Sequence, residues 1–137
     1  MSYITPKTDW VATDKFNISD YNRIKNNLNY LHEKACLVFG NFTIEDMGAD
    51  ISAYTGLWNY ADFNKFENNL DTINQHMLNE DIGVKKTFYG NSPFITYEEL
   101  NRIEGAIELM NTIIEGWYEG LYTLEFTVGK PKGIYRS

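Results

Sequence analysis

The chain has 137 residues, a length that suits one domain with a sizeable core and is too short for two. Its net charge is −7 although Lys130, Lys132 and Arg136 make the last eight residues basic, so the acidic body repels phosphate backbones and nucleic-acid binding is not expected. One cysteine, Cys36, excludes an internal disulfide and a multi-cysteine metal site. Without an apolar run of about 18 residues no membrane span is expected, and without a basic and then apolar N-terminus no secretory signal is expected.

Residues 1–16 are predicted to form an extended arm. Pro6 biases its neighbours away from helix, and Trp10 is a candidate anchor, either into the body of the protein or into an adjacent subunit. The aromatic content of 15% fits both alternatives, because Tyr and Trp fill large cores and are also enriched on surfaces that partners bury.

Three amphipathic helices are predicted where apolar side chains recur at steps of three and four residues. Their ranges are 18–38, 60–78 and 97–118. Each start carries an N-cap residue with an acid three positions later, a pattern that satisfies the first free N–H groups of a helix. The cap residues are Asn17, Asn59 and Thr96.

The segments between and after these helices carry weaker signals. A short helix is predicted from Thr43 to just before Gly56, and residues 79–95 form a long connection with a brief strand over 84–89. Beyond Gly120, apolar and polar residues alternate, which predicts a strand over 122–128. A turn and a second strand would complete a β-hairpin that packs on the helices or adds to another chain's sheet.

The three helix starts share one pattern, an acid, an apolar residue, Asn, a base and an apolar residue, with a further apolar residue at the ninth position. The acid and the base are three residues apart, which favours an ion pair worth roughly 0.2–0.5 kcal/mol. Asn is a mediocre helix former, so we interpret each repeated Asn as fixing the loop that enters its own helix, in preference to a ligand contact. The repeated Asn and base residues are Asn22, Arg23, Asn64, Lys65, Asn101 and Arg102.

The sequence contains no recognisable pattern for catalysis or for a cofactor. Glu104 and Glu108 are four residues apart, but neither His32 nor His76 follows a Glu at the spacing of a di-metal bundle, so we interpret the two carboxylates as a solvated acidic face. Neither a Gly-x-Ser-x-Gly elbow nor a complete phosphate loop occurs, and Cys36 has no evident basic partner. We therefore expect no enzyme, no cofactor and no metal site.

A set of segments spread over most of residues 3–108 belongs together. It comprises Tyr3-Ile-Thr-Pro-Lys-Thr-Asp-Trp10, Glu99-Leu-Asn-Arg-Ile-Glu104, and residues 16–17, 20–28, 46–50, 81–83, 86–89 and 93–94. Together they resemble a family of small structural proteins from tailed bacteriophages and prophages of low-GC Gram-positive bacteria. The Leu-Asn-Arg-Ile-Glu phrase is similar to a segment of many phage tail and fibre-associated proteins. The resemblance implies a virion component present in several copies and carries over no catalytic residue.

These patterns predict a mainly α fold, a small helical bundle of three long helices and one short helix. It has an extended arm (1–16), a helical domain (17–120, with repeat units 17–38, 59–78 and 96–118), and a C-terminal β-hairpin with a basic tail (121–137). We expect a non-enzymatic virion subunit of the tail, baseplate or fibre junction, made in the host cytoplasm, that binds other phage structural proteins and copies of itself. The alternatives are a head–tail neck component and a module that binds surface glycan through aromatic residues. Candidate interface residues are Trp10, Trp58, Lys130, Lys132 and Arg136, the last three in a tail that is solvated or that tethers an acidic neighbour.

Overall fold

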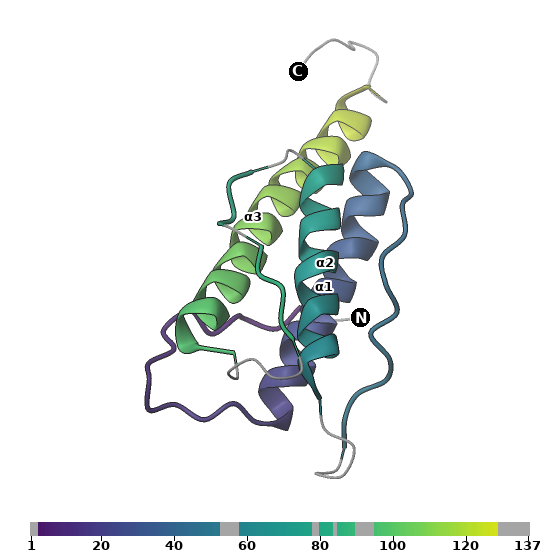
Figure 1. Cartoon of the computed structure of the whole chain (residues 1–137). Helices are drawn as coiled ribbons and strands as arrows, with labels where there is room; N and C mark the ends of the chain where they lie inside the picture. Colours follow the sequence, from purple (N-terminus) through teal and green to yellow (C-terminus); the bar gives the residue numbers. More distant parts are fainter. Residues whose placement is uncertain (1–2, 53–57, 78–79, 84, 90–94, 129–137) are drawn as a thin grey trace.

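The computed structural model describes residues 3–52, 58–77, 80–83, 85–89 and 95–128, with side chains in the last helix described as far as Trp117. Three α-helices, α1 (Ile18–Phe39), α2 (Tyr60–His76) and α3 (Tyr97–Val128), pack against one another in a bundle (Figure 1). No strand occurs among these residues, so the predicted mainly helical fold is confirmed for this part of the chain. No helix within it has both the length and the apolar composition needed to cross a bilayer.

The predicted helix starts are confirmed, because all three helices begin where their caps place them. The side chain of Asn17 accepts the backbone N–H of Asp20 at 3.2 Å, and the Asp20 carboxylate accepts the N–H of Asn17 at 3.0 Å. The same reciprocal box forms at Asn59, and Thr96 Oγ1 accepts the N–H three residues later at 3.3 Å. These bonds satisfy N–H groups that have no partner inside a helix.

An extended segment precedes each helix. We name these segments the first arm (residues 3–16), the second arm (residues 40–52) and the third arm (residues 80–83 and 85–89). The second and third arms lead from the end of one helix back to the level at which the next begins, so the three helices run in the same direction and the arms run antiparallel to them (Figure 1). Such long connections are uncommon in a small domain unless they are packed or functional.

The predicted apolar stripes of the three helices meet in one core, where the largest fully buried side chains include Ile24, Leu28, Leu31, Phe66, Leu70, Ile73, Ile103, Ile107, Met110 and Ile114. Aromatic rings gather near the helix starts around Tyr21. Phe66 lies 5.0 Å from Tyr21 between ring centroids, and Trp58 stacks on it at 5.3 Å. Much of the aromatic content therefore serves the core of this chain.

Tyr21 makes the stability of the fold sensitive to alkaline pH. Burial, and then the nearby charge of Asp62, raise the pKa of Tyr21 to about 12, so the native state holds this proton more tightly than the unfolded chain does. We expect the free energy of unfolding to fall as the pH rises from about 10, the ordinary Tyr pKa, towards 12. Tyr21→Phe should reduce this fall without abolishing it, because the pKa of Tyr3 is also raised to about 12. Equal falls in urea-unfolding series on the two proteins would contradict the assignment.

The short helix predicted after Thr43 is wrong for residues 43–52, which are not helical; its remaining residues lie outside the described part. Gly48 has a φ of +79°, outside the range of a right-handed helix. The backbone N–H groups of Glu45 and Ile51 bond instead to side chains of α2 and α1. Long-range contacts thus satisfy groups that a local helix would have bonded internally. The strand predicted over 84–89 is likewise not found at residues 85–89.

α3 continues to Val128, beyond the predicted end at residue 118. Helical backbone therefore occupies residues 122–128, where alternation predicts the first strand of a hairpin, and the turn and second strand lie outside the described residues. The same sequence also fits a helix, because residues 107, 110, 114, 117, 121, 124 and 128 are all apolar at steps of three and four. Extending a helix that already exists avoids the cost of nucleating a new element.

Candidate functional site

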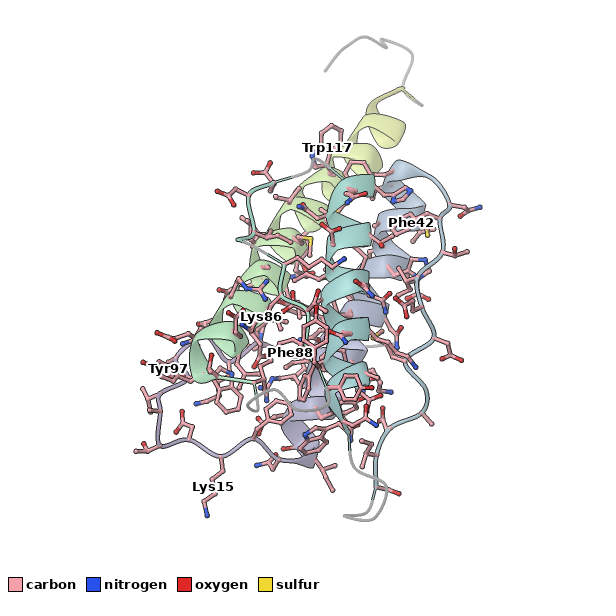
Figure 2. All side chains as sticks on the ribbon, in the orientation of Figure 1. Lys15, Phe42, Lys86, Phe88, Tyr97 and Trp117 are labelled. Atoms are coloured by element: carbon pink, nitrogen blue, oxygen red, sulfur yellow. The ribbon has the colours of Figure 1, made fainter. Side chains whose placement is uncertain are left out.

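The three repeated asparagines each hold the backbone of one arm. In every case the side-chain Oδ1 accepts the N–H, and Nδ2 donates to the C=O, of a single arm residue at 2.7–2.9 Å. We call this arrangement an asparagine clip, and it imitates the paired bonds of neighbouring antiparallel strands. The pairs are Asn22 with Ile51, Asn64 with Phe88 and Asn101 with Trp10. Figure 2 shows Phe88 of the third arm beside α2.

Each clip holds a different arm from the one expected. Asn22 of α1 holds the second arm, which enters α2, and Asn64 of α2 holds the third arm, which enters α3. Asn101 of α3 holds the first arm, 91 residues away in the sequence, which enters α1. The interpretation that each Asn fixes the loop into its own helix is therefore wrong, whereas a role in fixing loops is confirmed. The clips connect the three helices in a closed cycle.

We call Asn22, Asn64 and Asn101 the first clip position of their helices. Further polar side chains, five and ten residues after this position, extend the pattern. Asn27 clips Ile4 of the first arm at 2.7 and 2.9 Å, and Asn69 clips Glu45 of the second arm at 2.8 and 3.0 Å. Ten residues after the first position, Asn74 clips Glu80 at 2.7 and 2.9 Å, and His32 Nε2 lies 2.6 Å from the C=O of Phe42. Asn27 and Asn69 are each the second residue of an Asn-Asn pair, at 26–27 and 68–69, and this pair is the sequence signal for their clips.

Removing one clip should measurably loosen the fold. Asn101→Ala should lower the free energy of unfolding by about 1–3 kcal/mol, because both backbone polar groups of buried Trp10 lose their partner. Asn26→Ala is a matched control, since Asn26 also lies on a helix but bonds to the Asp50 side chain at an exposed position, and should change stability by less than about 0.5 kcal/mol. Urea unfolding of the two variants measures this difference, and equal effects would contradict the clip.

A buried carboxylate joins the first arm to α1 and α3. Glu104 is fully buried and accepts four hydrogen bonds, from the backbone N–H of Lys7 (3.0 Å), the indole N–H of Trp10 (2.7 Å) and two nitrogens of Arg23 (2.8 and 2.6 Å). Arg23 also pairs with Asp20 at 2.8 Å. The interpretation of Glu104 as part of a solvated face is therefore wrong, because helical spacing alone does not reveal that an arm covers that part of α3.

An equivalent ion pair joins α3 to α2. Arg102 bonds to buried Glu67 and, at 2.8 Å, to Glu99 three residues before it. Burial raises the pKa of the Glu67 carboxyl, and the hydrogen bond from Arg102 opposes that rise. Gly83 of the third arm has a φ of +89°, and a Cβ there would come within 2.6 Å of Arg102 Cδ. A side chain at this position would therefore displace Arg102 from its carboxylates.

The third member of this set has the opposite charge. The carboxylates that pair with Arg23 and Arg102 are Glu104 of α3 and Glu67 of α2, and each lies three residues after the first clip position of its helix. The corresponding residue of α1 is Lys25. Lys65, the base of α2, forms no ion pair in the described part of the chain. Lys25 is buried and donates instead to the C=O of Gly48 at 3.3 Å and to Asp50 at 2.5 Å, both in the second arm. Lys25 thus fixes the second arm as a hydrogen-bond donor, whereas Glu104 fixes the first arm as an acceptor.

These polar centres serve structure. Glu104 and Glu67 are sealed from solvent and paired with arginines, so neither is placed to exchange a proton with a substrate. Glu108 is exposed, and within the described ranges no group of three His, Cys, Asp or Glu side chains could hold a metal. Cys36 is a free thiol whose Sγ lies 3.5 Å from the C=O of Phe42.

The candidate interface residues fall in different places. Trp10 is 3% exposed and lies in the core of its own chain, which supports an anchor into the body over an anchor into a neighbour. Trp58 is half-buried, stacked on Tyr21 and met edge-on by Phe16 at 5.1 Å. The tail residues Lys130, Lys132 and Arg136 lie outside the described residues.

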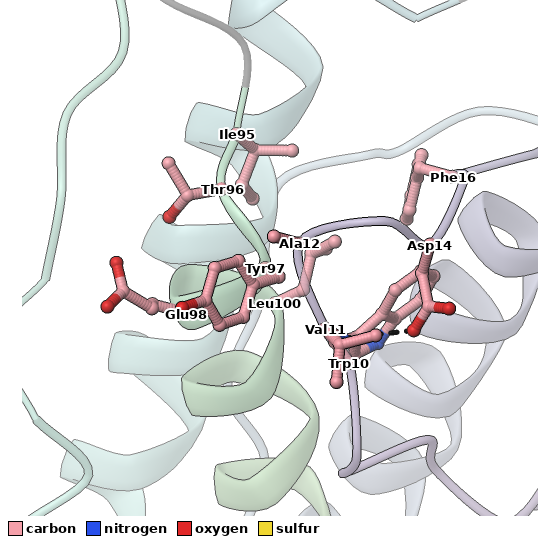
Figure 3. A pocket seen from close by; sticks show the side chains of 10 residues that line it. All are labelled: Trp10, Val11, Ala12, Asp14, Phe16, Ile95, Thr96, Tyr97, Glu98 and Leu100. Atoms are coloured by element: carbon pink, nitrogen blue, oxygen red, sulfur yellow. Dashed lines mark hydrogen bonds between the residues drawn. The ribbon is translucent and has the colours of Figure 1, made fainter.

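A cavity of about 350 Å³ opens between the first arm and the start of α3 (Figure 3). Trp10 and Val11 line it from the arm, and Tyr97 and Leu100 line it from α3. Asp14 is engaged with the N–H of Val11 at 3.0 Å. The lining residues are largely apolar, and they suit a contact surface better than a reaction.

Comparison of the chain with protein-family models, with curated proteins and with solved structures finds no match.

Proposed function

We propose that the protein is a non-enzymatic structural subunit of a tailed-phage virion, in the tail, baseplate or fibre junction, bound to other structural proteins and to copies of itself. The resemblance over most of residues 3–108 motivates this proposal. The observation that carries it is that the buried charged groups and the clip asparagines all bond to other parts of the same chain, where they fix the arms to the helices. A chain of this kind is suited to contact with other polypeptides.

Large apolar side chains on the surface support the same proposal. Leu37 is 63% exposed and Trp117 is 47% exposed, so a large part of each apolar side chain remains in contact with solvent. Obligate assembly interfaces bury on the order of 2,000 Å² or more and are rich in such side chains. The large exposed apolar residues are Ile4, Val11, Leu37, Tyr60, Tyr89, Tyr97, Leu109 and Trp117.

The far end of α3 is the place where we expect neighbouring subunits to bind. The ring of Trp117 lies 5.6 Å from the ring of Phe39, the last residue of α1, so the α3 backbone after Trp117 runs past the end of α1 (Figures 1 and 2). Residues 118–128 add about 16 Å of helix there at 1.5 Å per residue.

Mass spectrometry of purified phage particles, separated into heads and tails, tests the proposal. Peptides of this chain should occur in the tail fraction at a fixed stoichiometry. Their occurrence in the neck or head fraction would favour the head–tail neck alternative, and their absence from washed particles would overturn the virion assignment. Sedimentation of the isolated chain gives a second test, because a subunit that binds copies of itself should show concentration-dependent association.

A glycan-binding role is the weaker alternative. It needs aromatic faces that are open to a sugar ring, and Trp10 offers none because it is 3% exposed. Trp58 already stacks on Tyr21. Binding to a glycan array that is lost on Trp58→Ala would revive this alternative.

A further inference from the structure

The two arginine–glutamate ion pairs that join the helices are not equally well satisfied. At Glu104 both carboxylate oxygens are bonded, because Arg23 donates to each of them and the backbone N–H of Lys7 donates to Oε1 at 3.0 Å. Glu67 has the corresponding place on α2, and its Oε2 accepts the bond from Arg102. Its Oε1 has no hydrogen-bond partner among the described residues. The ion pair at Glu67 is therefore the less complete of the two.

Glu67 needs a further donor. The residue is 1% exposed, so bulk solvent does not reach the unbonded oxygen. A buried acceptor without a donor destabilises a fold, and the loss is larger when the group is charged. Burial raises the pKa of Glu67, and Arg102 and then the backbone N–H of Lys86 oppose this rise. The N–H of Lys86 thus lies near the carboxylate, but it does not reach Oε1 with the geometry of a hydrogen bond.

A small cavity lies beside this ion pair. Its volume is about 40 Å³. The polar side chains and the glycine that line it are Glu67 and Asp71 of α2, Gly83 and Lys85 of the third arm, and Arg102 of α3. A space of about 10–15 Å³ is enough for one water molecule, whereas organic ligands occupy pockets of about 300 Å³ or more. The size of the cavity therefore suits water.

The charges around the cavity also favour a neutral ligand. Glu67 and Asp71 contribute two acids to its walls, and Lys85 and Arg102 contribute two bases, so an ion of either sign would be repelled as well as attracted. A water molecule can donate to a carboxylate oxygen and accept from a guanidinium at the same time. Buried waters typically make about three hydrogen bonds to polar groups that would otherwise lack a partner.

We propose that one water molecule is bound in this cavity and donates a hydrogen bond to Oε1 of Glu67. The guanidinium of Arg102 and the carboxylate of Asp71 line the same space and supply its other bonds, the first as a donor and the second as an acceptor. The water thus serves at Glu67 the purpose that the backbone N–H of Lys7 serves at Glu104. The ion pair between α2 and α3 is completed by solvent, whereas protein groups alone complete the ion pair between α1 and α3.

This inference does not depend on a role in the virion, and NMR of the isolated chain tests it. The measurement is the nuclear Overhauser effect between water and the methyl protons of Leu70, which lines the cavity and is 1% exposed. We expect a cross-peak of the same sign as contacts within the protein, because a bound water tumbles with it. Ile73 is the matched control, since it is fully buried on the same helix but does not line the cavity, and it should show no cross-peak to water.

Two variants identify what holds the water. Glu67→Met removes the acceptor and should abolish the cross-peak at Leu70. Glu99→Gln alters the other carboxylate that Arg102 contacts, which does not line the cavity, and should leave the cross-peak in place. Arg102 is present in both variants, so a signal relayed by its own exchangeable protons would persist in both.

Three results would overturn the inference. The first is the absence of the cross-peak at Leu70 in the native sequence, or a cross-peak of the opposite sign, which needs no variant and so decides the matter even if Glu67→Met does not fold. The second is a cross-peak that persists in folded Glu67→Met, because Glu67 would then not hold the water. The third is an equal loss in both variants, because the signal would then follow the position of Arg102. A crystal structure with a water molecule hydrogen-bonded to Oε1 of Glu67 would confirm the contact directly.

Discussion

Glu104→Gln should lower the free energy of unfolding by about 3–5 kcal/mol, because it breaks a buried ion pair and leaves Arg23 with Asp20 as its remaining carboxylate. The native carboxylate accepts bonds from Lys7, Trp10 and Arg23 and has no donor of its own. A glutamine of nearly the same shape would direct an N–H₂ group at one or more of these donors. Urea unfolding at neutral pH measures the change.

Glu108→Gln is the control for this substitution, since Glu108 lies four residues along the same helix and is exposed. It should alter stability by less than about 0.5 kcal/mol. A loss below about 1 kcal/mol for Glu104→Gln would show that solvent reaches this carboxylate, and the account of the first arm as a packed element would then be wrong.

Phe66→Ala should cause a loss of similar size, about 3–5 kcal/mol, through the cavity that it leaves. Phe66 is fully buried, and its ring centroid lies 5.0 Å from that of Tyr21 and 5.8 Å from that of Phe63. Both aromatic contacts would be lost together with the transfer free energy of the ring. Thermal and urea unfolding should agree on the size of the effect if the protein unfolds in one step.

Leu37→Ala provides the comparison for the core substitution, because Leu37 is also on a helix but is 63% exposed. We expect its effect on the isolated chain to stay within about 0.5 kcal/mol. If Phe66→Ala proved equally mild, the apolar stripes of the three helices would not form the core described here.

The helices were predictable because their signals are local. Caps at Asn17 and Asn59, and apolar residues at steps of three and four, identify the start of a helix without reference to the rest of the chain. The ends were less certain, as α3 shows. Its sequence after Gly120 fits both a strand and a continued helix, and local pattern alone does not decide between them.

The arms were not predictable in this way, because what fixes them lies elsewhere in the sequence. The capping pattern at Thr43 favours a helix, but Asn22 and Asn69 bond to the backbone of that segment and hold it extended. The sequence pattern alone places Glu104 on the surface of its helix, whereas in the structure Lys7 and Arg23 bond to its carboxylate and cover it. The repetition of Asn was visible in the sequence, whereas the helix-to-arm order of the cycle required the structure.

The central claim is that asparagine clips hold three extended arms against three parallel helices. Hydrogen exchange of backbone amides measured by NMR tests it most directly, because segments outside helices and sheets ordinarily exchange fast. We predict slow exchange at the clipped N–H groups of Trp10, Ile51 and Phe88, with Asn101→Ala accelerating exchange at Trp10 while Ile51 and Phe88 stay protected. Fast exchange at all three amides in the native sequence would contradict the account.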